Sequence, residues 1–556
     1  MFRIVILAFL LIINGNFTIA QTEKPKLIVG IVVDQMRFDH LYKYQQRFSE
    51  GGFKRLIREG YNFKNTTINY IPTVTAAGHA SIYTGTTPSN HGIIGNTWYQ
   101  RSTKETITNI GDAQEFLVGI SKEDSYGASP RNMLATTISD QLKLDTNFKA
   151  KVISVSLKDR GAILPGGHTA DGAYWQDWKN SPGNFVSSTF YMEKLPKWVT
   201  SFNKLGKSDA YLSETWNTLY PVESYTASAP DDNSYERAIG GKSSPTFPYD
   251  FKTMRERYKE LDAEYQLMWV NPAGNTLLTD FAIEAIKSEG LGQDNITDLI
   301  NISYSVPDVI GHTFGPQSVE FEDIILRLDR DIENLLKSLD SSVGSGNYLL
   351  FLTSDHGSIP VASYLRNNKL PTGIAKIKEY EAALQTHLNS KFGLNQWIEN
   401  FDGEAVYLNN DLIKQKKLSQ KIVHQEAADF LMTQEEITAA TTADQLQTQN
   451  YSHGNNLLLQ NGYHSKRSGD VLLVFKPGFI QSIQPGITMD KIKGTTHGSG
   501  FAYDTHIPLL WYGNSIPKGE SVRKVSITDI APSVSMFLNI SYPSAATGEP
   551  LKELFE

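Results

Sequence analysis

The stretch LIVGIVVD at residues 27–34 decides the fold class. Its residues before Asp34 are apolar and mostly β-branched, which is typical of a strand buried on both faces of a parallel sheet, and the run stops abruptly at a charge. Further short apolar runs stop at polar residues in the same way, and these are 151–157, 299–306, 348–352 and 471–475. We therefore predict that these runs are strands of a mostly parallel sheet.

Helical patterns alternate with these runs. The clearest is 319–339, where apolar residues recur at helical spacing, at Ile324, Ile325, Leu328, Ile332, Leu335, Leu336 and Leu339. Strands that alternate with helices predict an α/β fold, a doubly wound and mostly parallel sheet sandwiched by helices. Ligands of such sheets bind at the carboxyl ends of the strands, so we expect the charged residues there to meet in one place.

Two long stretches lack this alternation. Residues 168–275 are rich in Trp, Tyr, Pro and Ser, and residues 360–495 mix amphipathic helical patterns with loops. We interpret both as insertions that cap the site of a single catalytic domain at 21–556. The sequence shows no internal repeat and no low-complexity linker that would separate independent modules.

Composition excludes several classes of protein. Of the 556 residues, 40% are hydrophobic and 20% are charged, which is an ordinary globular composition. The formal net charge of -8 gives no broad basic surface, so nucleic acid is not expected as a groove-bound partner. Cysteine is absent, which excludes disulfides, thiolate zinc sites, iron–sulfur clusters and a cysteine nucleophile. A metal site must use His, Asp and Glu.

The first twenty residues predict a secretory signal peptide. Arg3 precedes the apolar run 4–13, and small residues up to Ala20 suit a cleavage site there. The run is shorter than the about 20 helical residues that cross a bilayer, and no comparable stretch follows, so we expect no membrane span, with a retained anchor as the alternative. We expect a monomeric bacterial protein that is periplasmic or secreted.

Metal-binding residue types lie at or after the predicted strand ends. They are Asp34, Asp308, His312, Asp355, His356 and, in the segment GTTHG, His497. Each is a weak signal alone, because a strand-end Asp is often a cap and a lone His is often structural. Zinc sites that act on phosphate esters use such ligands and often hold two ions about 4 Å apart.

The order Asp, Thr, Asp-x-x-x-His, Asp-His, His resembles the alkaline phosphatase superfamily across nearly the whole chain. The segment IPTVTAAGHA at 71–80 is similar to the nucleophile segment of its nucleotide pyrophosphatase/phosphodiesterase-like branch. The resemblance implies that Thr75 attacks phosphorus and that Asn96 binds a phosphate oxygen. Thr75 also precedes a helix predicted at 76–84, whose free N–H groups favour a phosphoryl group. A plain helix cap is the alternative role for Thr75.

The resemblance also implies two Zn²⁺ per chain. The first would be held by Asp308, His312 and His497. The second would be held by Asp34, Asp355 and His356, with Thr75 bridging toward it as a further ligand. We interpret His79 and His91 as structural residues that support the nucleophile segment.

The basic pair Lys158 and Arg160, with the segment GAILPGG after it, resembles that of PafA-type alkaline phosphatases. Those enzymes keep the Thr nucleophile and prefer monoesters, whose three terminal oxygens bind added cations tightly. The resemblance implies a zinc-dependent alkaline phosphatase that hydrolyses phosphate monoesters with broad specificity through a phosphothreonine intermediate. An exposed turn is the alternative explanation for the pair.

Other activities remain to be separated from this one. A phosphodiesterase or nucleotide pyrophosphatase would share every metal ligand and Thr75, and would differ at the basic pair. A sulfatase is disfavoured, because its Cys/Ser-x-Pro-x-Arg motif is absent, and an intracellular phosphoglycerate mutase conflicts with the signal segment. A non-catalytic exported binding protein on the same fold is the alternative from another class, against which the complete ligand set counts.

Overall fold

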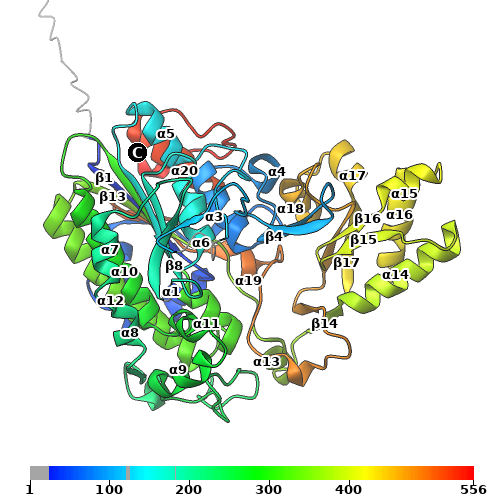
Figure 1. Ribbon diagram of the computed structural model, residues 1–556, viewed down its shortest axis with the longest axis horizontal. Helices are drawn as coiled ribbons and strands as arrows, with labels where there is room; N and C mark the ends of the chain where they lie inside the picture. The colour runs from blue at the N-terminus through cyan, green and yellow to red at the C-terminus, as the bar shows by residue number, and fades with distance from the viewer. Residues whose placement is uncertain (1–23, 121–125, 182) are drawn as a thin grey trace, which may run out of the picture.

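A ten-stranded sheet forms the centre of the protein (Figure 1). The computed structural model describes residues 24–120, 126–181 and 183–556, so the predicted signal segment lies outside the described residues. In spatial order the strands are β22 (Gly519–Ser521), β2 (Tyr61–Phe63), β21 (Leu509–Gly513), β13 (Tyr348–Thr353), β1 (Leu27–Val33), β12 (Asp298–Tyr304), β7 (Val152–Ser156), β8 (Gly172–Asp177), β9 (Asn184–Ser188) and β6 (Leu117–Val118). The run from β13 to β8 is parallel, and β21 and β9 flank it as antiparallel strands.

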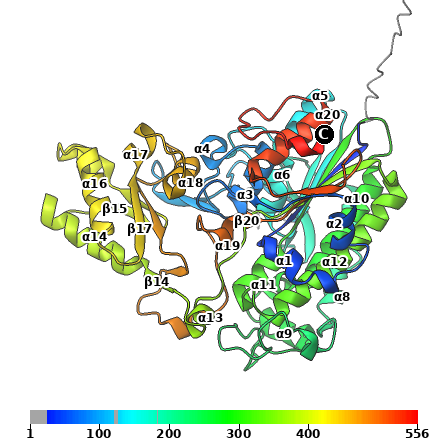
Figure 2. The ribbon, with the colours of Figure 1, turned by 180° about the vertical axis from the view of Figure 1, so that it is seen from behind.

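Helices cover both faces of this sheet, as Figures 1 and 2 show. Val29 and Ile31 of β1 pack on one face with α10 (Ala273–Glu289) and α12 (Val319–Leu339). Ile28 and Val32 point to the other face, against α3 (Thr75–Thr84), α5 (Ile138–Asp145) and α20 (Ile530–Leu538). Burial on both faces explains why β1 carries no polar residue before Asp34. The α/β prediction is confirmed, and α12 has the predicted bounds.

Two strand predictions need correction. The run 299–306 ends as a strand at Tyr304, because Val306 begins the helix α11 (Val306–Phe314), so Asp308 lies in the first helical turn. The run 471–475 is a strand, β18, but it pairs antiparallel with β16 (Ala405–Leu408) and β17 (Ile437–Thr442) in a separate sheet. Its place in the central sheet was wrongly predicted.

This second sheet belongs to a lobe that stands beside the central body in Figures 1 and 2. Its order is β15 (Ile398–Phe401), β16, β18 and β17. The helices α14 (Ile377–Phe392) and α16 (Gln420–Leu431) pack on it around a core of their own. The other predicted insertion, 168–275, contributes β8 and β9 to the central sheet. One catalytic domain with two caps stays a prediction.

The register of the central strands positions the site. Val32 of β1 is level with both Ser303 of β12 and Thr353 of β13, and Ser303 is level with Ser156 of β7. Four adjacent parallel strands therefore end at one level, and the residues that follow them meet at one edge. No helix among the described residues is both long and apolar enough to span a membrane.

Candidate active site

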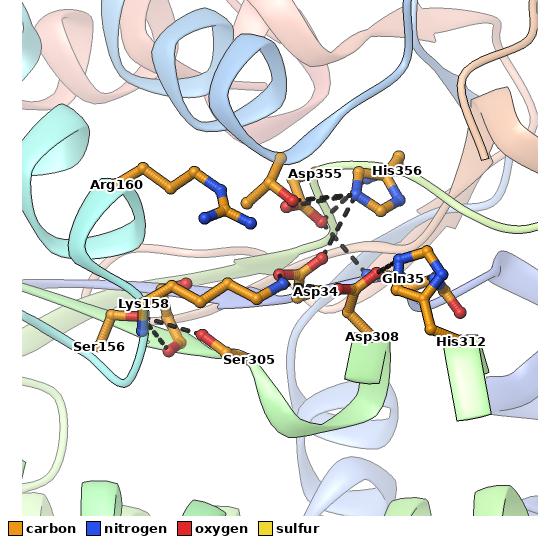
Figure 3. Close-up of polar contacts among 12 residues, drawn as sticks. Asp34, Gln35, Ser156, Lys158, Arg160, Ser305, Asp308, His312, Asp355 and His356 are labelled. Atoms are coloured by element: carbon orange, nitrogen blue, oxygen red, sulfur yellow. Dashed lines mark hydrogen bonds and ion pairs between the residues drawn. The ribbon is translucent and has the colours of Figure 1, made fainter. Parts of the chain in front are cut away.

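The residues that follow the four strand ends form a compact polar group (Figure 3). Asp34 follows β1, Asp355 and His356 follow β13, and Asp308 and His312 lie one helical turn apart on α11. His497 reaches the same place from the loop at 492–501, which lies after the lobe in sequence. The fold thus brings all six predicted Asp and His ligands together.

Two sets of three ligands are close enough to hold an ion. One ligand atom from each of Asp34, Asp355 and His356 lies within 4.8 Å of the others, and the same holds for Asp308, His356 and His497. His312 stands beside the second set, with Nε2 3.2 Å from Asp308 Oδ1. His356 is close to both sets, so the assignment of ligands to a first and a second ion stays a prediction.

Hydrogen bonds orient the three imidazole rings for metal binding. The Nδ1 atoms of His312, His356 and His497 lie 2.8–2.9 Å from the backbone oxygens of Thr495, Gly357 and Thr73, respectively. A carbonyl oxygen only accepts, so each Nδ1 is the donor, and a neutral ring then carries its lone pair on Nε2. His356 Nε2 lies 3.3 Å from Asp34 Oδ1, an arrangement of two acceptors that a cation would stabilise.

The carboxylates need positive charge as well. Asp34 Oδ1 and Asp355 Oδ2 are buried and accept no hydrogen bond in the described chain. Burial, with Asp308 and Asp355 nearby, raises the pKa of Asp34 to about 7. Burial would also raise the pKa of Asp308, but His312 and Lys158 beside it hold that pKa well below its usual range. Hard oxygen and imidazole donors that are not fully balanced by positive charge fit divalent cations such as Zn²⁺.

Lys158 supplies one positive charge to this group. It is the residue before α6 (Asp159–Gly166), it is almost fully buried, and its Nζ lies 2.7 Å from Asp34 Oδ2 and 2.6 Å from Asp308 Oδ2. Arg160, partly buried, extends toward the same group in Figure 3, and its buried Nε donates no hydrogen bond within the described residues. The exposed-turn explanation therefore does not fit the pair.

Thr75 begins α3 directly above these ligands. Its Oγ1 is buried 3.4 Å from His356 Nε2, and the capping position belongs to Val74, so Thr75 is not a plain cap. The Ala76 N–H donates to Asn96 Oδ1 at 3.0 Å. This bond identifies the amide oxygen and leaves Asn96 Nδ2, which makes no hydrogen bond to any described residue, available as a donor. The nucleophile candidate and an oxygen-binding candidate are thus adjacent.

The helix α3 can approach the predicted ligands because Gly78 lies in its first turn. A Cβ at Gly78 would lie 2.5 Å from the backbone oxygen of Asp355. His79 further fixes the segment, with Nδ1 2.9 Å from the Thr75 backbone oxygen and Nε2 2.8 Å from Ser303 Oγ. His91 lies farther back, with Nε2 2.9 Å from Ser81 Oγ. Both contacts suit the predicted structural role of these histidines.

Sequence reasoning missed Gln35. Its backbone has a positive φ of 66°, its buried Nε2 donates to Asp308 Oδ1 at 2.7 Å, and its N–H donates to Asp355 Oδ1 at 3.3 Å. It therefore orients two proposed ligands. Its place directly after Asp34 was the only signal that the sequence offered.

Comparison with known proteins agrees with this geometry. The family model described as type I phosphodiesterase / nucleotide pyrophosphatase matches residues 28–499. The chain belongs to this family. Among relatives within it, alkaline phosphatase PafA of Elizabethkingia meningoseptica is 39% identical, over 98% of this chain and 97% of that protein. Alkaline phosphatase PhoV of Synechococcus elongatus is 41% identical, over 96% of this chain and 93% of that protein.

Solved structures of PafA share the fold of this chain over nearly the whole length of the chain. The wild-type crystal structure matches with a TM-score of 0.89 at 39% identity, covering 96% of this chain and 99% of that one. A PafA variant matches with a TM-score of 0.88 at 40% identity, with coverages of 96% and 99%. That variant is changed at a Thr, an Asn, a Lys and an Arg, in the same order and with the same spacing as Thr75, Asn96, Lys158 and Arg160.

Proposed function

We propose that this chain is an alkaline phosphatase that hydrolyses phosphate monoesters with broad specificity. The observation that carries the proposal is the presence of two cationic side chains beside the predicted ligands. Lys158 Nζ lies 2.7 Å from Asp34 Oδ2 and 2.6 Å from Asp308 Oδ2, and Arg160 extends toward the same group in Figure 3. Two cations match the charge of a monoester dianion better than the single charge of a diester. The names of the full-length relatives PafA and PhoV support the same activity.

We infer that two zinc ions complete the site. Asp308, His312 and His497 would hold one, and Asp34, Asp355 and His356 the other. When bound, such ions lower the pKa of a hydroxyl group and stabilise negative charge on phosphate and leaving oxygens. The buried carboxylate oxygens without hydrogen bonds, together with the imidazole Nε2 atoms, are the ligand atoms that two zinc ions would require.

Thr75 acts as the nucleophile. Its Oγ1 attacks phosphorus in line with the ester oxygen, the phosphorus–oxygen ester bond breaks, and the alcohol leaves with a proton. Water then attacks the phosphothreonine from the opposite side, which releases phosphate and restores the Thr75 hydroxyl. Asn96 Nδ2, Lys158 and Arg160 hold the remaining phosphate oxygens, where the charge stays high in the transition state.

Replacement of the nucleophile tests this mechanism. We expect Thr75→Ala to lower kcat for an aryl phosphate monoester by about 10³-fold or more, as happens when a nucleophile is removed, with zinc content unchanged. Thr75→Ser keeps a hydroxyl and should retain far more activity. Turnover of Thr75→Ala near the wild-type rate would show that another group attacks phosphorus.

A phosphodiesterase is the second candidate, because the matching family is named for that activity. The kcat/KM values for matched aryl phosphate monoester, diester and sulfate substrates separate the candidates. A monoester preference of several orders of magnitude is expected. A diester preference would move the protein to the phosphodiesterase branch while keeping Thr75 and the metal ligands.

We also propose export of the protein and a monomeric state. Cleavage near Ala20 would leave a mature chain beginning at Gln21, which intact-mass measurement of the protein recovered from the periplasm or medium would detect. Light scattering would measure the molar mass in solution. A retained N-terminus or a dimeric mass would contradict these proposals separately.

A further inference from the structure

A cavity of about 310 Å³ opens beside His497. One wall is the loop that carries His497 and continues to Phe501, and Ile71 of the segment before Thr75 adjoins it. The opposite wall comes from the lobe. Its residues there are Glu404, Leu473, Phe475 and Phe479. Figure 1 shows the lobe sheet on the side of the body where α19 (Ala502–Thr505) lies.

The cavity is linked to the proposed nucleophile through His497, which lines it. The His497 ring stacks on His356 with a centroid distance of 3.6 Å, and His356 Nε2 in turn lies 3.4 Å from Thr75 Oγ1. Thr75 is directed toward the proposed second ion, so in an in-line attack the alcohol portion would leave toward the first ion, whose proposed ligands include His497. The cavity opens beside this histidine.

Glu404 is the unpaired charge of this cavity. Its Oε1 lies close to Gly498, where an added Cβ would be 3.1 Å away, and the carboxylate has no hydrogen bond or ion pair with any described side chain. The other charged lining residues have partners, since Lys476 Nζ lies 3.3 Å from Glu435 Oε1 and Asp504 accepts hydrogen bonds from Ser499.

The surroundings of Glu404 favour a bound cation. Burial, together with the nearby Asp402, raises the pKa of the Glu404 carboxyl to about 8, so its charged form lacks stabilisation. The walls are largely apolar, formed by Ile71, Leu473, Phe475 and Phe501. Apolar walls bury the body of a ligand, and a carboxylate among them forms a charge-assisted hydrogen bond with an ammonium group.

We propose that this cavity holds the alcohol portion of the substrate and that Glu404 selects phosphate monoesters whose alcohol carries an apolar body and an ammonium group. The proposal rests on the proposed phosphatase activity and names a substrate class for it. It also assigns a role to the lobe, which supplies Glu404 and one wall of the cavity.

A matched pair of esters tests the selection. The substrates are para-(aminomethyl)phenyl phosphate, which carries an ammonium group, and para-tolyl phosphate, which does not. We measure kcat/KM for both with wild type, Glu404→Gln and Glu404→Asp. The ratio between the two esters, compared between proteins, cancels their different leaving-group reactivity. We expect Glu404→Gln to lower the preference for the ammonium ester about tenfold, the effect of losing one hydrogen bond to a charged group.

Glu381→Gln is the control, since Glu381 lies on α14 of the same lobe, pairs with Lys378, and does not line the cavity. It should leave the ratio unchanged. The carboxylate retained in Glu404→Asp should keep part of the preference, which separates charge from local disruption. Calorimetric binding of the matched benzylphosphonates to Thr75→Ala, with and without Glu404→Gln, gives the same ratio without turnover.

The activities of wild type and Glu404→Gln distinguish a failure of the Glu404 inference from a failure of the phosphatase proposal. A wild-type enzyme that hydrolyses both esters, with a ratio that Glu404→Gln does not change, would overturn the inference and leave the phosphatase proposal intact. A wild-type protein that hydrolyses neither ester would overturn both. A lower ratio in Glu404→Gln together with weaker binding of the ammonium phosphonate would support the inference.

Discussion

Lys158 illustrates how one side chain serves both the site and the fold. Its ammonium group contacts Asp34 and Asp308, which are proposed ligands of different ions. Burial would lower the pKa of Lys158, but these carboxylates raise it above its usual value, so the side chain is charged. Lys158 therefore offsets repulsion between two buried carboxylates and, in the proposed mechanism, presents a positive charge to phosphate.

Arg160 should discriminate between ester classes. We expect Arg160→Ala to lower kcat/KM for an aryl phosphate monoester about 10²-fold, the typical effect of removing one donor to a developing charge, and to affect the matched diester much less. The diester has fewer terminal oxygens with which Arg160 could interact, so it loses less when Arg160 is removed. Parallel assays of Arg58→Ala, an exposed arginine on α2 (Phe53–Glu59), provide the control. Equal losses on both esters would assign Arg160 a structural role.

Gln35 should increase the affinity of the site for metal. Its Nε2 donates to Asp308 Oδ1, so Gln35→Ala would leave a proposed ligand less firmly oriented. We expect zinc affinity to fall about 10–100-fold, the usual effect of losing a group that orients a ligand. Competition with a zinc chelator measures the affinity directly. Unchanged affinity would mean that the backbone alone orients Asp308.

At the scale of elements, the close packing of α3 against Asp355 depends on Gly78. We expect Gly78→Ala to lower kcat strongly, because the added Cβ would displace the helix that carries Thr75 from the ligands. Gly166→Ala is the matched control, since a Cβ there would make only ordinary contacts of 3.4 Å or more. Kinetics and circular dichroism of both variants would check this. Full activity of Gly78→Ala would show that α3 can shift freely.

Local patterns predicted the central elements well. In β1 and α12 the order of apolar and polar residues follows directly from which positions are buried. Local patterns failed where the burial of a segment does not determine its place in the fold. The run 471–475 is as buried as a central strand, yet nothing local in β18 says which sheet it joins. Likewise, the apolar run after β12 continues into α11, which hid the end of the strand.

The candidate site was predictable to the extent that its chemistry depends on residue type. Aspartate and histidine at strand ends indicate metal binding, and family resemblance added Thr75 and the basic pair. The role of Gln35 depends instead on a positive φ and on contacts with residues far along the chain. Glu404 was missed for a similar reason, because only the packed lobe brings it to Gly498.

For the whole molecule, bound metal should contribute to stability. Without cations, the buried carboxylates of Asp34, Asp308 and Asp355 repel one another. Ions that bind only the folded chain stabilise it by about 4 kcal/mol at 1,000 times their dissociation constant. We expect chelation to lower the melting temperature by several degrees and to abolish activity, with both restored by added zinc. Calorimetry and elemental analysis measure this, and an unchanged melting temperature after proven metal loss would contradict it.

The proposed ligands are spread along the chain from Asp34 to His497, on strand ends, a helix and a loop that meet only when the central sheet is assembled. A ribosome or an export channel that has released residues up to the lobe has therefore released an inert polypeptide. Any fragment cut before residue 497 lacks a ligand however well its remaining strands pair. Turnover of this protein consequently counts chains that have been made at least as far as His497, and its first appearance during synthesis would come no earlier than that point.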